Sequence, residues 1–283
     1  MNFSIIKAGQ DQFAIFQTMY SNADYNMWYD WEQRLQDTKW TNECYFVLLD
    51  EKKIGGYIAV ADTICYPFLI APYANREEFW RFVLEQNSKR YINGVSEADV
   101  EVLQDHEYRI LSGNQVMCRP TEQLCVNLNQ EFTCMGISEY RKQNADYLLG
   151  KLIVDGYKGS ICNEIFGEAT VDLAVDDMLE VLAVYHNADY SKVILDRDNQ
   201  LAALCLAGTG DHYLNNYAEI ADLCVLPRYR GKGLARYLIT NVLSSAYGKS
   251  PYVKLLVHKG NTAETLYREM GFISGPVFYN MEK

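Results

Sequence analysis

The chain lacks several features that mark other classes of protein. None of its eight cysteines forms a C-x-x-C pair, and none of its four histidines lies near such a pair, which argues against a zinc site. No apolar run approaches the ~18 residues that a membrane span needs. Met1–Ala8 is too short and too polar for a secretory signal. These absences predict a cytoplasmic protein with reduced, mostly buried cysteines, no metal and no membrane partner.

Charge is unevenly distributed along the chain. Residues 1–227 hold 17 Lys and Arg against 34 Asp and Glu, a net charge of −17, whereas residues 228–283 hold nine against three, a net charge of +6. A basic segment in an acidic chain suits an anionic ligand. The acidic remainder either attracts a cationic, amine-bearing acceptor or only keeps the protein soluble. This balance argues against nucleic acid as a partner.

The segment Arg228–Ala235, with the sequence R-Y-R-G-K-G-L-A, is the most informative stretch. It follows an apolar run at Ile220–Leu226 and opens an amphipathic run at Leu234–Ala246, so a strand leads through a glycine turn into a helix. The first N–H groups of such a helix lack intrahelical partners and carry the positive end of the helix dipole, which suits pyrophosphate or another anion. Glycines at 231 and 233 let the backbone approach phosphate oxygens.

The spacing differs from two other phosphate-binding motifs. It is no P-loop, because G-K-[ST] is missing, and no dinucleotide fingerprint, because Arg236 stands in place of the third glycine. A basic glycine turn can also be a simple helix cap. Downstream, Asn261–Phe272 (N-T-A-E-T-L-Y-R-E-M-G-F) predicts a short helix that Gly271 ends. In this order and at this spacing, the two motifs resemble the signatures of the GNAT superfamily of acetyl-CoA-dependent N-acyltransferases.

The resemblance implies an α/β fold with a mixed sheet, in which the C-terminal half has the GNAT fold and uses acetyl-CoA as co-substrate. Leu223 and Val225 match the strand whose backbone pairs with the pantetheine arm, and the Val225 N–H matches the oxyanion donor. Tyr267 matches the tyrosine that protonates the departing sulfur. The other matching coenzyme positions are Asn261 and the pyrophosphate-binding residues Arg230, Gly231, Lys232, Gly233, Leu234 and Ala235.

Two carboxylates precede the glycine turn and are candidates for the general base. Regular strand alternation would place Glu219 on one face with Ala221, Leu223 and Val225, and Asp222 on the other. The corresponding GNAT strand is commonly bulged, which can move one carboxylate to the other side. We expect Glu219 first and Asp222 second as base, acting directly or through water. Either could instead be a surface or ion-paired residue, and an acyl-enzyme on Cys224 is a further alternative.

The first half of the chain resembles a weaker copy of the same plan. Tyr45–Asp50 and Ile54–Val60 repeat the pattern of two later strands, and Phe68–Pro72 repeats that of the strand before the glycine turn. The helix that should follow carries Glu77 and Glu78 in place of glycines, so we expect no coenzyme there. The predicted domains are 1–122, a degenerate GNAT-like domain, and 123–283, the catalytic GNAT domain. An unrelated α/β domain is the alternative for the first half.

Hydrophobic periodicity predicts the remaining elements. The aromatic cluster Tyr25–Trp31 is predicted to lie on a helix, where it packs in a core, walls the acceptor pocket or lines the seam between the halves. The other predicted helices are 139–154, 171–184, 234–246 and 262–270, and the predicted strands of the second half are 191–196, 200–207, 218–226, 252–257 and 277–281.

The leading functional hypothesis is an N-acetyltransferase that moves an acyl group from acetyl-CoA to a primary amine of a small molecule or peptide, by direct attack in a ternary complex. A second hypothesis is a non-catalytic protein that senses acyl-CoA. A third is a scaffold whose glycine turn only caps a helix. The chain would act as a monomer or a homodimer.

Overall fold

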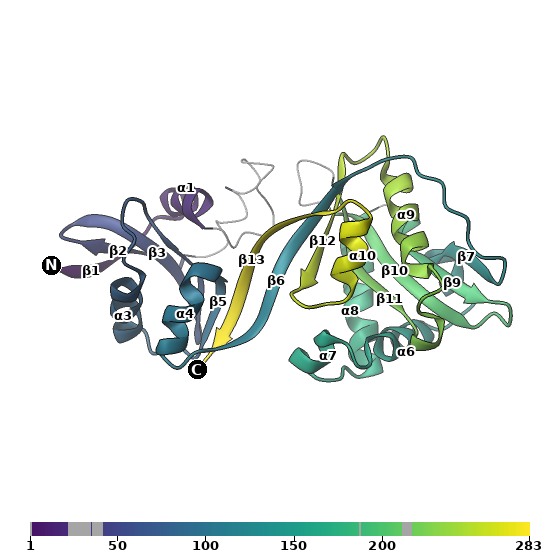
Figure 1. Cartoon of the computed structure of the whole chain (residues 1–283), viewed down its shortest axis with the longest axis horizontal. Helices are drawn as coiled ribbons and strands as arrows, with labels where there is room; N and C mark the ends of the chain where they lie inside the picture. The colour runs from purple at the N-terminus through teal and green to yellow at the C-terminus, as the bar shows by residue number, and fades with distance from the viewer. Residues whose placement is uncertain (1, 22–34, 36–41, 187, 211–216) are drawn as a thin grey trace. The chain divides into compact units, whose positions relative to one another are not determined.

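The structure is a computed structural model of the 283-residue chain that describes residues 2–21, 35, 42–186, 188–210 and 217–283 (Figure 1). The aromatic cluster predicted at 25–31 lies outside the described residues. Contacts divide the chain into two compact units, unit 1 with Met1–Gln115 and Pro276–Lys283, and unit 2 with Val116–Gly275. The last eight residues therefore group with unit 1. The domain boundaries predicted above, 1–122 and 123–283, remain a prediction.

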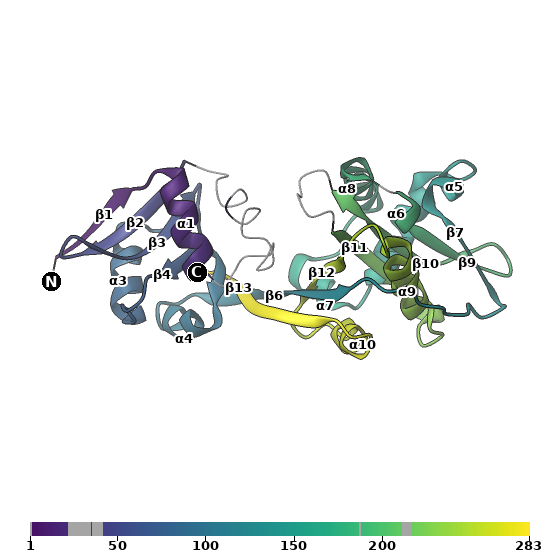
Figure 2. The same cartoon turned by 90° about the horizontal axis from the view of Figure 1, so that it is seen from above.

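Unit 1 is a sheet in the order β1-β2-β3-β4-β5-β13-β6 with helices on both faces. Phe13 of α1 packs in one apolar cluster, and Trp80 of α3 and Leu103 of α4 pack in a second one. The helix α1 lies on one face of the sheet, and α3 and α4 lie on the other (Figures 1 and 2). Amphipathic spacing in each helix explains the two layers. The elements are β1(Phe3–Lys7), α1(Gln10–Tyr20), β2(Cys44–Leu49), β3(Lys52–Val60), β4(Thr63–Leu69), α3(Arg76–Gln86), β5(Tyr91–Ser96), α4(Glu97–Asp105), β6(Arg109–Pro120) and β13(Ile273–Glu282).

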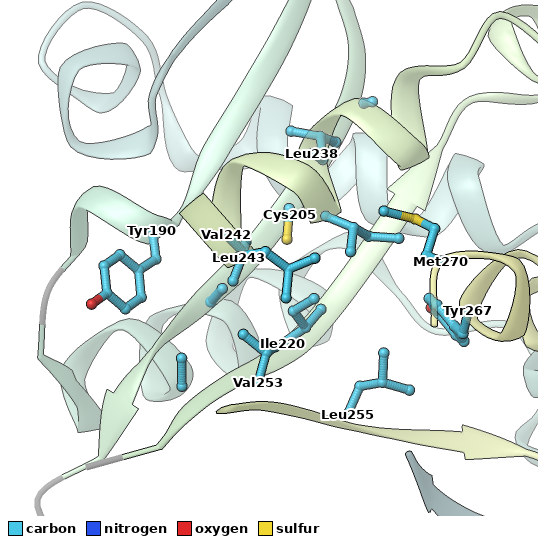
Figure 3. Packing of buried hydrophobic residues seen from close by; sticks show 14 of the residues in the cluster. Tyr190, Cys205, Ile220, Leu238, Val242, Leu243, Val253, Leu255, Tyr267 and Met270 are labelled. Carbon is cyan, nitrogen blue, oxygen red and sulfur yellow. The ribbon is translucent and has the colours of Figure 1, made fainter. Parts of the chain in front are cut away.

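Unit 2 is a sheet in the order β6-β12-β11-β10-β9-β7, again covered on both faces. Leu238, Val242 and Leu243 of α9 gather over Ile220 and neighbouring apolar side chains of the sheet in one cluster (Figure 3). Side chains of α5, α6 and α8 form the other cluster. The elements are β7(Phe132–Gly136), α5(Ile137–Arg141), α6(Asp146–Tyr157), α7(Ile161–Phe166), α8(Val171–Val184), β8(Tyr185–His186), η1(Ala188–Tyr190), β9(Lys192–Asp196), β10(Leu201–Gly210), β11(Ala218–Val225), η2(Pro227–Tyr229), α9(Leu234–Ala246), β12(Tyr252–His258) and α10(Ala263–Glu269).

The two units repeat the same construction at their central strands. In unit 1, β4 pairs with β5 in parallel from Thr63 to Cys65. In unit 2, β11 pairs with β12 in parallel from Ala218 to Ile220. In each case the first strand then gains one residue relative to its antiparallel neighbour, next to Tyr66 in β4 and at Ala221 in β11. The N-terminal half therefore repeats the strand plan of the C-terminal half, as the sequence predicts.

Most predicted elements are present, and two are wrong in extent. The strand predicted over 277–281 is the longer β13, which begins at Ile273 and ends at Glu282. α8 and α9 have the predicted bounds. The predicted helix 139–154 is instead two helices, α5 and α6, because the chain becomes extended at Ala145 (φ −73°, ψ 142°) before α6 begins. Arg141 bridges the break through an ion pair with Asp146.

The fold buries most of the cysteines. All eight cysteines are free thiols; five are buried, Cys134 and Cys162 are half-buried and Cys125 is exposed.

Within the ranges that the structure describes, no helix is long and apolar enough to cross a membrane.

Candidate functional site

Unit 2 has a cleft where β11 and β12 separate, here called the β11–β12 cleft. Their parallel pairing stops at Ile220 and Leu255, although β11 runs on to Val225 and β12 to His258. The space between the diverging strands has a volume of about 560 Å³. Its walls are the ends of β11 and β12, the end of α6 with the segment up to Cys162, and the segment from Gly260 to Tyr267.

The bulge in β11 decides which face each side chain takes. Leu206 of β10 pairs with Asp222 and Ala207 pairs with Ile220, so Ala221 is the extra residue. Before the bulge, Ile220 packs in the cluster beneath α9; after it, the odd-numbered Leu223 packs against that same cluster. Even-numbered residues of β11 therefore face α9 before Ala221, and odd-numbered residues face it afterwards. The regular alternation that put Glu219 with Leu223 and opposite Asp222 is wrong, because Glu219 and Asp222 both lie on the face away from α9.

Asp222 is the carboxylate that lines the cleft. Its Oδ1 accepts a hydrogen bond of 2.6 Å from the hydroxyl of Tyr157, in the last turn of α6. Burial raises the pKa of Asp222 to about 6, although the hydrogen bonds from Tyr157 and from the Leu223 N–H favour its charged form. Burial and the charge of Asp222 raise the pKa of Tyr157 well above its ordinary value. The pair thus combines a carboxyl that titrates near neutrality with a phenol that stays protonated.

Glu219 lies beside the paired part of the two strands. Its neighbour in the parallel register is Lys254 of β12, and the Lys254 Nζ is 3.7 Å from the Glu219 Oε2. Lys254 is almost fully buried and donates a hydrogen bond of 2.9 Å to the hydroxyl of Tyr217. The ion-paired alternative for Glu219 is therefore the arrangement that the structure contains. The cleft lining along β11 begins one residue later, at Ile220.

The outer edge of β11 is open toward the cleft. The Leu226 N–H bonds to the Ala202 carbonyl of β10, so alternate residues back along the strand also turn toward β10. The peptide groups of Leu223 and Val225 consequently point away from β10, into the cleft that both residues line. The Leu223 N–H bonds to the Asp222 carboxylate and the Val225 carbonyl accepts from Arg230. An extended ligand could therefore join this edge as an added strand through the Leu223 carbonyl and the Val225 N–H.

The glycine turn has the backbone conformation that its sequence predicts. Gly231 has φ 76° and Gly233 has φ 79°, both in the left-handed region that favours glycine. Gly233 precedes α9 and no side chain caps that helix, so the N–H groups of its first turn are left for a ligand or solvent. Ala235 lines the cleft and Leu234 is buried. Lys232 Nζ lies 3.7 Å from Glu131.

Two predicted coenzyme contacts are engaged within the protein. The Arg230 side chain donates to the carbonyls of Val225 (3.2 Å) and Gly156 (2.7 Å). Asn261 lines the cleft, and its Oδ1 accepts a hydrogen bond of 2.9 Å from the Ala263 N–H at the start of α10. Asn261 therefore shapes the entry to α10 whatever else it contacts.

Tyr267 lies on the buried face of α10, where it lines the cleft and is 7% exposed. Its ring packs 5.9 Å from that of Phe272. Burial is the main cause that raises the pKa of Tyr267 above its ordinary value, so the phenol keeps its proton at neutral pH. This is the protonation state that donation to a forming thiolate requires.

Sequence reasoning missed the contribution of α6. Tyr157 is 65 residues from Asp222, and only the fold brings them together. Gly156 is the visible signal for this contact: a Cβ there would lie 2.9 Å from the Cys224 Cβ, so a residue without a side chain is needed where α6 crosses β11. Lys254 was missed because a lysine within a strand is ordinarily a solvated residue. In the part of the chain that the structure describes, no group of three His, Cys, Asp or Glu residues could hold a metal ion.

Comparisons with known proteins agree with this geometry. Residues 167–278 match the family model described as the acetyltransferase (GNAT) domain. Among solved structures, the chain is similar to a GCN5-related N-acetyltransferase from Sphaerobacter thermophilus, with 13% identity, a TM-score of 0.66, and 99% of this chain and 95% of that chain covered. A GNAT-family acetyltransferase from Colwellia psychrerythraea is 12% identical over 100% of this chain and 99% of that one, with a TM-score of 0.55.

A tandem GNAT protein from the clavulanic acid biosynthesis pathway is 10% identical, with a TM-score of 0.53, and covers 100% of this chain and 98% of that one. At such identities, these likenesses concern the fold. The sequence matches no curated protein. The family match and the shared fold confirm the resemblance of this chain to the GNAT superfamily. The likeness to the tandem protein agrees with two GNAT-like units in this chain.

Proposed function

We propose that this chain, whose residues 167–278 match the acetyltransferase (GNAT) domain model, transfers an acyl group from acetyl-CoA to a primary amine of a small molecule or peptide. The observation that carries the proposal is the continuity of the β11–β12 cleft with the glycine turn. An open strand edge at Leu223 and Val225 leads to an uncapped helix start at Gly233. A thioester arm that ends in a pyrophosphate needs both features along one path.

In this proposal the chain holds the co-substrate mainly with backbone groups. The N–H groups from Gly231 to Ala235 would bind the pyrophosphate at the positive end of the α9 dipole. Backbone groups of Leu223 and Val225 would pair with the pantetheine arm, apart from the Val225 carbonyl that Arg230 holds and the Leu223 N–H that Asp222 holds. The Val225 N–H would stabilise the oxyanion. Lys232 adds positive charge beside this path.

Asp222 is proposed as the general base, ahead of Glu219. Its carboxylate lines the cleft and its pKa of about 6 leaves it ionised at neutral pH while still able to take a proton. The amine attacks the thioester carbonyl carbon, a C–N bond forms and the C–S bond breaks. One proton passes from the amine to Asp222, directly or through water, and Tyr267 donates a proton to the departing sulfur and is reprotonated by solvent.

The position of Cys224 favours direct attack over an acyl-enzyme. The residue is 4% exposed and packs in the cluster beneath α6. Burial raises the pKa of its thiol well above the ordinary value, so little nucleophilic thiolate is present at neutral pH.

Thermal unfolding with and without acetyl-CoA tests the co-substrate site. Stabilisation should follow RT ln(1 + [L]/Kd), about 2.7 kcal/mol at a hundredfold excess over Kd. The Gly231→Glu variant should lose this stabilisation, because a side chain at φ 76° is strained and a carboxylate would occupy the anion site. A wild-type melting temperature that acetyl-CoA leaves unchanged at millimolar concentration would refute the proposal. Binding without turnover in a screen of amines would instead indicate the acyl-CoA sensor.

A further inference from the structure

Arg230 occupies an unusual place for an arginine in an anion-binding loop. Its guanidinium turns back into unit 2, where Nε donates to the Val225 carbonyl at 3.2 Å and the terminal NH2 group donates to the Gly156 carbonyl at 2.7 Å. Its own N–H bonds to the Pro227 carbonyl. The side chain thus joins two segments that are 69 residues apart in sequence, the last turn of α6 and the end of β11.

Both carbonyls need a donor from outside their own element. Gly156 lies in the last turn of α6, where carbonyl groups have no following helical turn to bond and where the helix dipole is negative. Val225 ends β11, and its peptide groups face the cleft rather than β10. A cationic donor satisfies both carbonyls with charge-assisted hydrogen bonds, and arginine alone among the side chains offers several donors in one rigid plane.

The same junction is closely packed. A Cβ at Gly156 would lie 2.9 Å from the Cys224 Cβ and 3.9 Å from the Val225 nitrogen, so α6 rests almost directly on the backbone of β11. One residue further, Tyr157 bonds to Asp222. The position of the α6 end relative to β11 therefore sets the wall of the cleft and the partner of the proposed base.

We propose that Arg230 is a positioning residue: it clamps the end of α6 to the end of β11 and so shapes the cleft for the pantetheine arm, and it is not a ligand of the pyrophosphate. This inference rests on the proposed function. It assigns the pyrophosphate to backbone N–H groups and to the other basic residues of the loop.

Binding of two probes separates the two roles. Acetyl-CoA spans the cleft and the loop, whereas 3′-phosphoadenosine 5′-diphosphate has the pyrophosphate but no pantetheine arm. Calorimetric Kd values should show Arg230→Met weakening acetyl-CoA by about tenfold, about 1.4 kcal/mol, and the nucleotide by less than about twofold. Arg228→Met is the matched charge control. It removes one positive charge from the same loop, where the guanidinium lies 4.8 Å from the Tyr229 ring, and should weaken both probes by the same factor.

Each other outcome has a definite reading. Equal weakening of both probes by Arg230→Met, as in Arg228→Met, or no weakening of either, would overturn the clamp. If Arg230→Met fails to fold, Arg230→Lys provides the test, because an ammonium keeps the charge but cannot hold both carbonyls in one plane. Arg230→Lys should weaken acetyl-CoA binding more than nucleotide binding. Equal changes in the two Kd values would overturn the inference. Wild-type protein that binds neither probe would refute the proposed function itself.

Discussion

Replacing Asp222 with asparagine is expected to stabilise unit 2 above pH 6 while it removes the proposed base. Burial raises the pKa of this carboxyl from 3.8 to about 6. The folded state therefore binds the Asp222 proton more tightly than the unfolded state does, and stability falls as pH rises from about 4 to about 6. A rise of about two pKa units corresponds to about 3 kcal/mol lost at pH 8 and about half of that at pH 5.

The loss of about 3 kcal/mol at pH 8 is an upper limit, because Asp222 keeps part of its surface open to the cleft. Asparagine carries no charge and can still accept the hydrogen bond from Tyr157, so Asp222→Asn should exceed the wild type by up to about 3 kcal/mol at pH 8 and by less at pH 5. Denaturant unfolding followed by circular dichroism measures the difference. Tryptophan fluorescence is unsuitable, because all four tryptophans lie among the first 80 residues.

Tyr157→Phe supplies the control. It removes the hydrogen bond that favours the charged carboxylate, so the pKa of Asp222 should rise further and the loss of stability should extend to higher pH. An Asp222→Asn variant that is less stable than the wild type at pH 8, or a difference that is the same at pH 5 and pH 8, would refute the account of a buried, raised carboxyl.

Three further predictions test other parts of the structure. Tyr267→Phe should lower kcat by about 10- to 100-fold without changing the Kd for acetyl-CoA, because only the proton donor is lost. Steady-state kinetics with an amine that is acetylated measures kcat, and calorimetry measures Kd. A changed Kd with an unchanged kcat would contradict the prediction. Gly156→Ala should destabilise the protein by about 1–3 kcal/mol in denaturant unfolding, because its Cβ would lie 2.9 Å from the Cys224 Cβ; an unchanged midpoint would show that α6 shifts freely. Asn75→Ala should cost about 1 kcal/mol, because Asn75 caps α3 through the Glu78 N–H, and a melting temperature equal to that of the wild type would contradict this.

Local signals in the sequence predicted the part of the site that local chemistry determines. Glycines at 231 and 233 indicate a turn with positive φ, and the apolar spacing of Leu234–Ala246 indicates one helix, because both depend on residues next to one another in the chain. The strand–turn–helix order followed directly from these signals. The resemblance to the GNAT superfamily rested on these same residues.

The face on which each carboxylate lies could not be read from alternation alone. Period-two counting assumes an unbroken pleat. The extra residue at Ala221 moves every later side chain of β11 to the opposite face from the one that counting predicts. A bulge has no strong local signature in A-E-I-A-D-L-C-V, since the register is set by the pairing with β10. The expected ranking of Glu219 before Asp222 depended on that register and on two distant partners, Lys254 and Tyr157.

The two units share a strand arrangement but differ at the positions that form the cleft and the helix start in unit 2. Both have a three-residue parallel pairing followed by a bulged strand and a helix. In unit 1 a Cβ on Gly94 of β5 would lie 2.3 Å from the Tyr66 ring, so this ring fills the place where β4 and β5 would separate. The helix start is occupied as well, because Asn75 caps α3 and Glu77 and Glu78 lie in its first turn.

In unit 2 the corresponding positions are left open. Ala221 stands at the bulge and has too small a side chain to fill the space between β11 and β12, and Gly233 begins α9 without a capping side chain. An uncapped helix start costs stability, as does a strand edge without a partner. Asn75 caps the corresponding helix α3 of unit 1, whereas the first N–H groups of α9 are left for a ligand or solvent. This contrast favours co-substrate binding over the helix-cap explanation of the glycine turn.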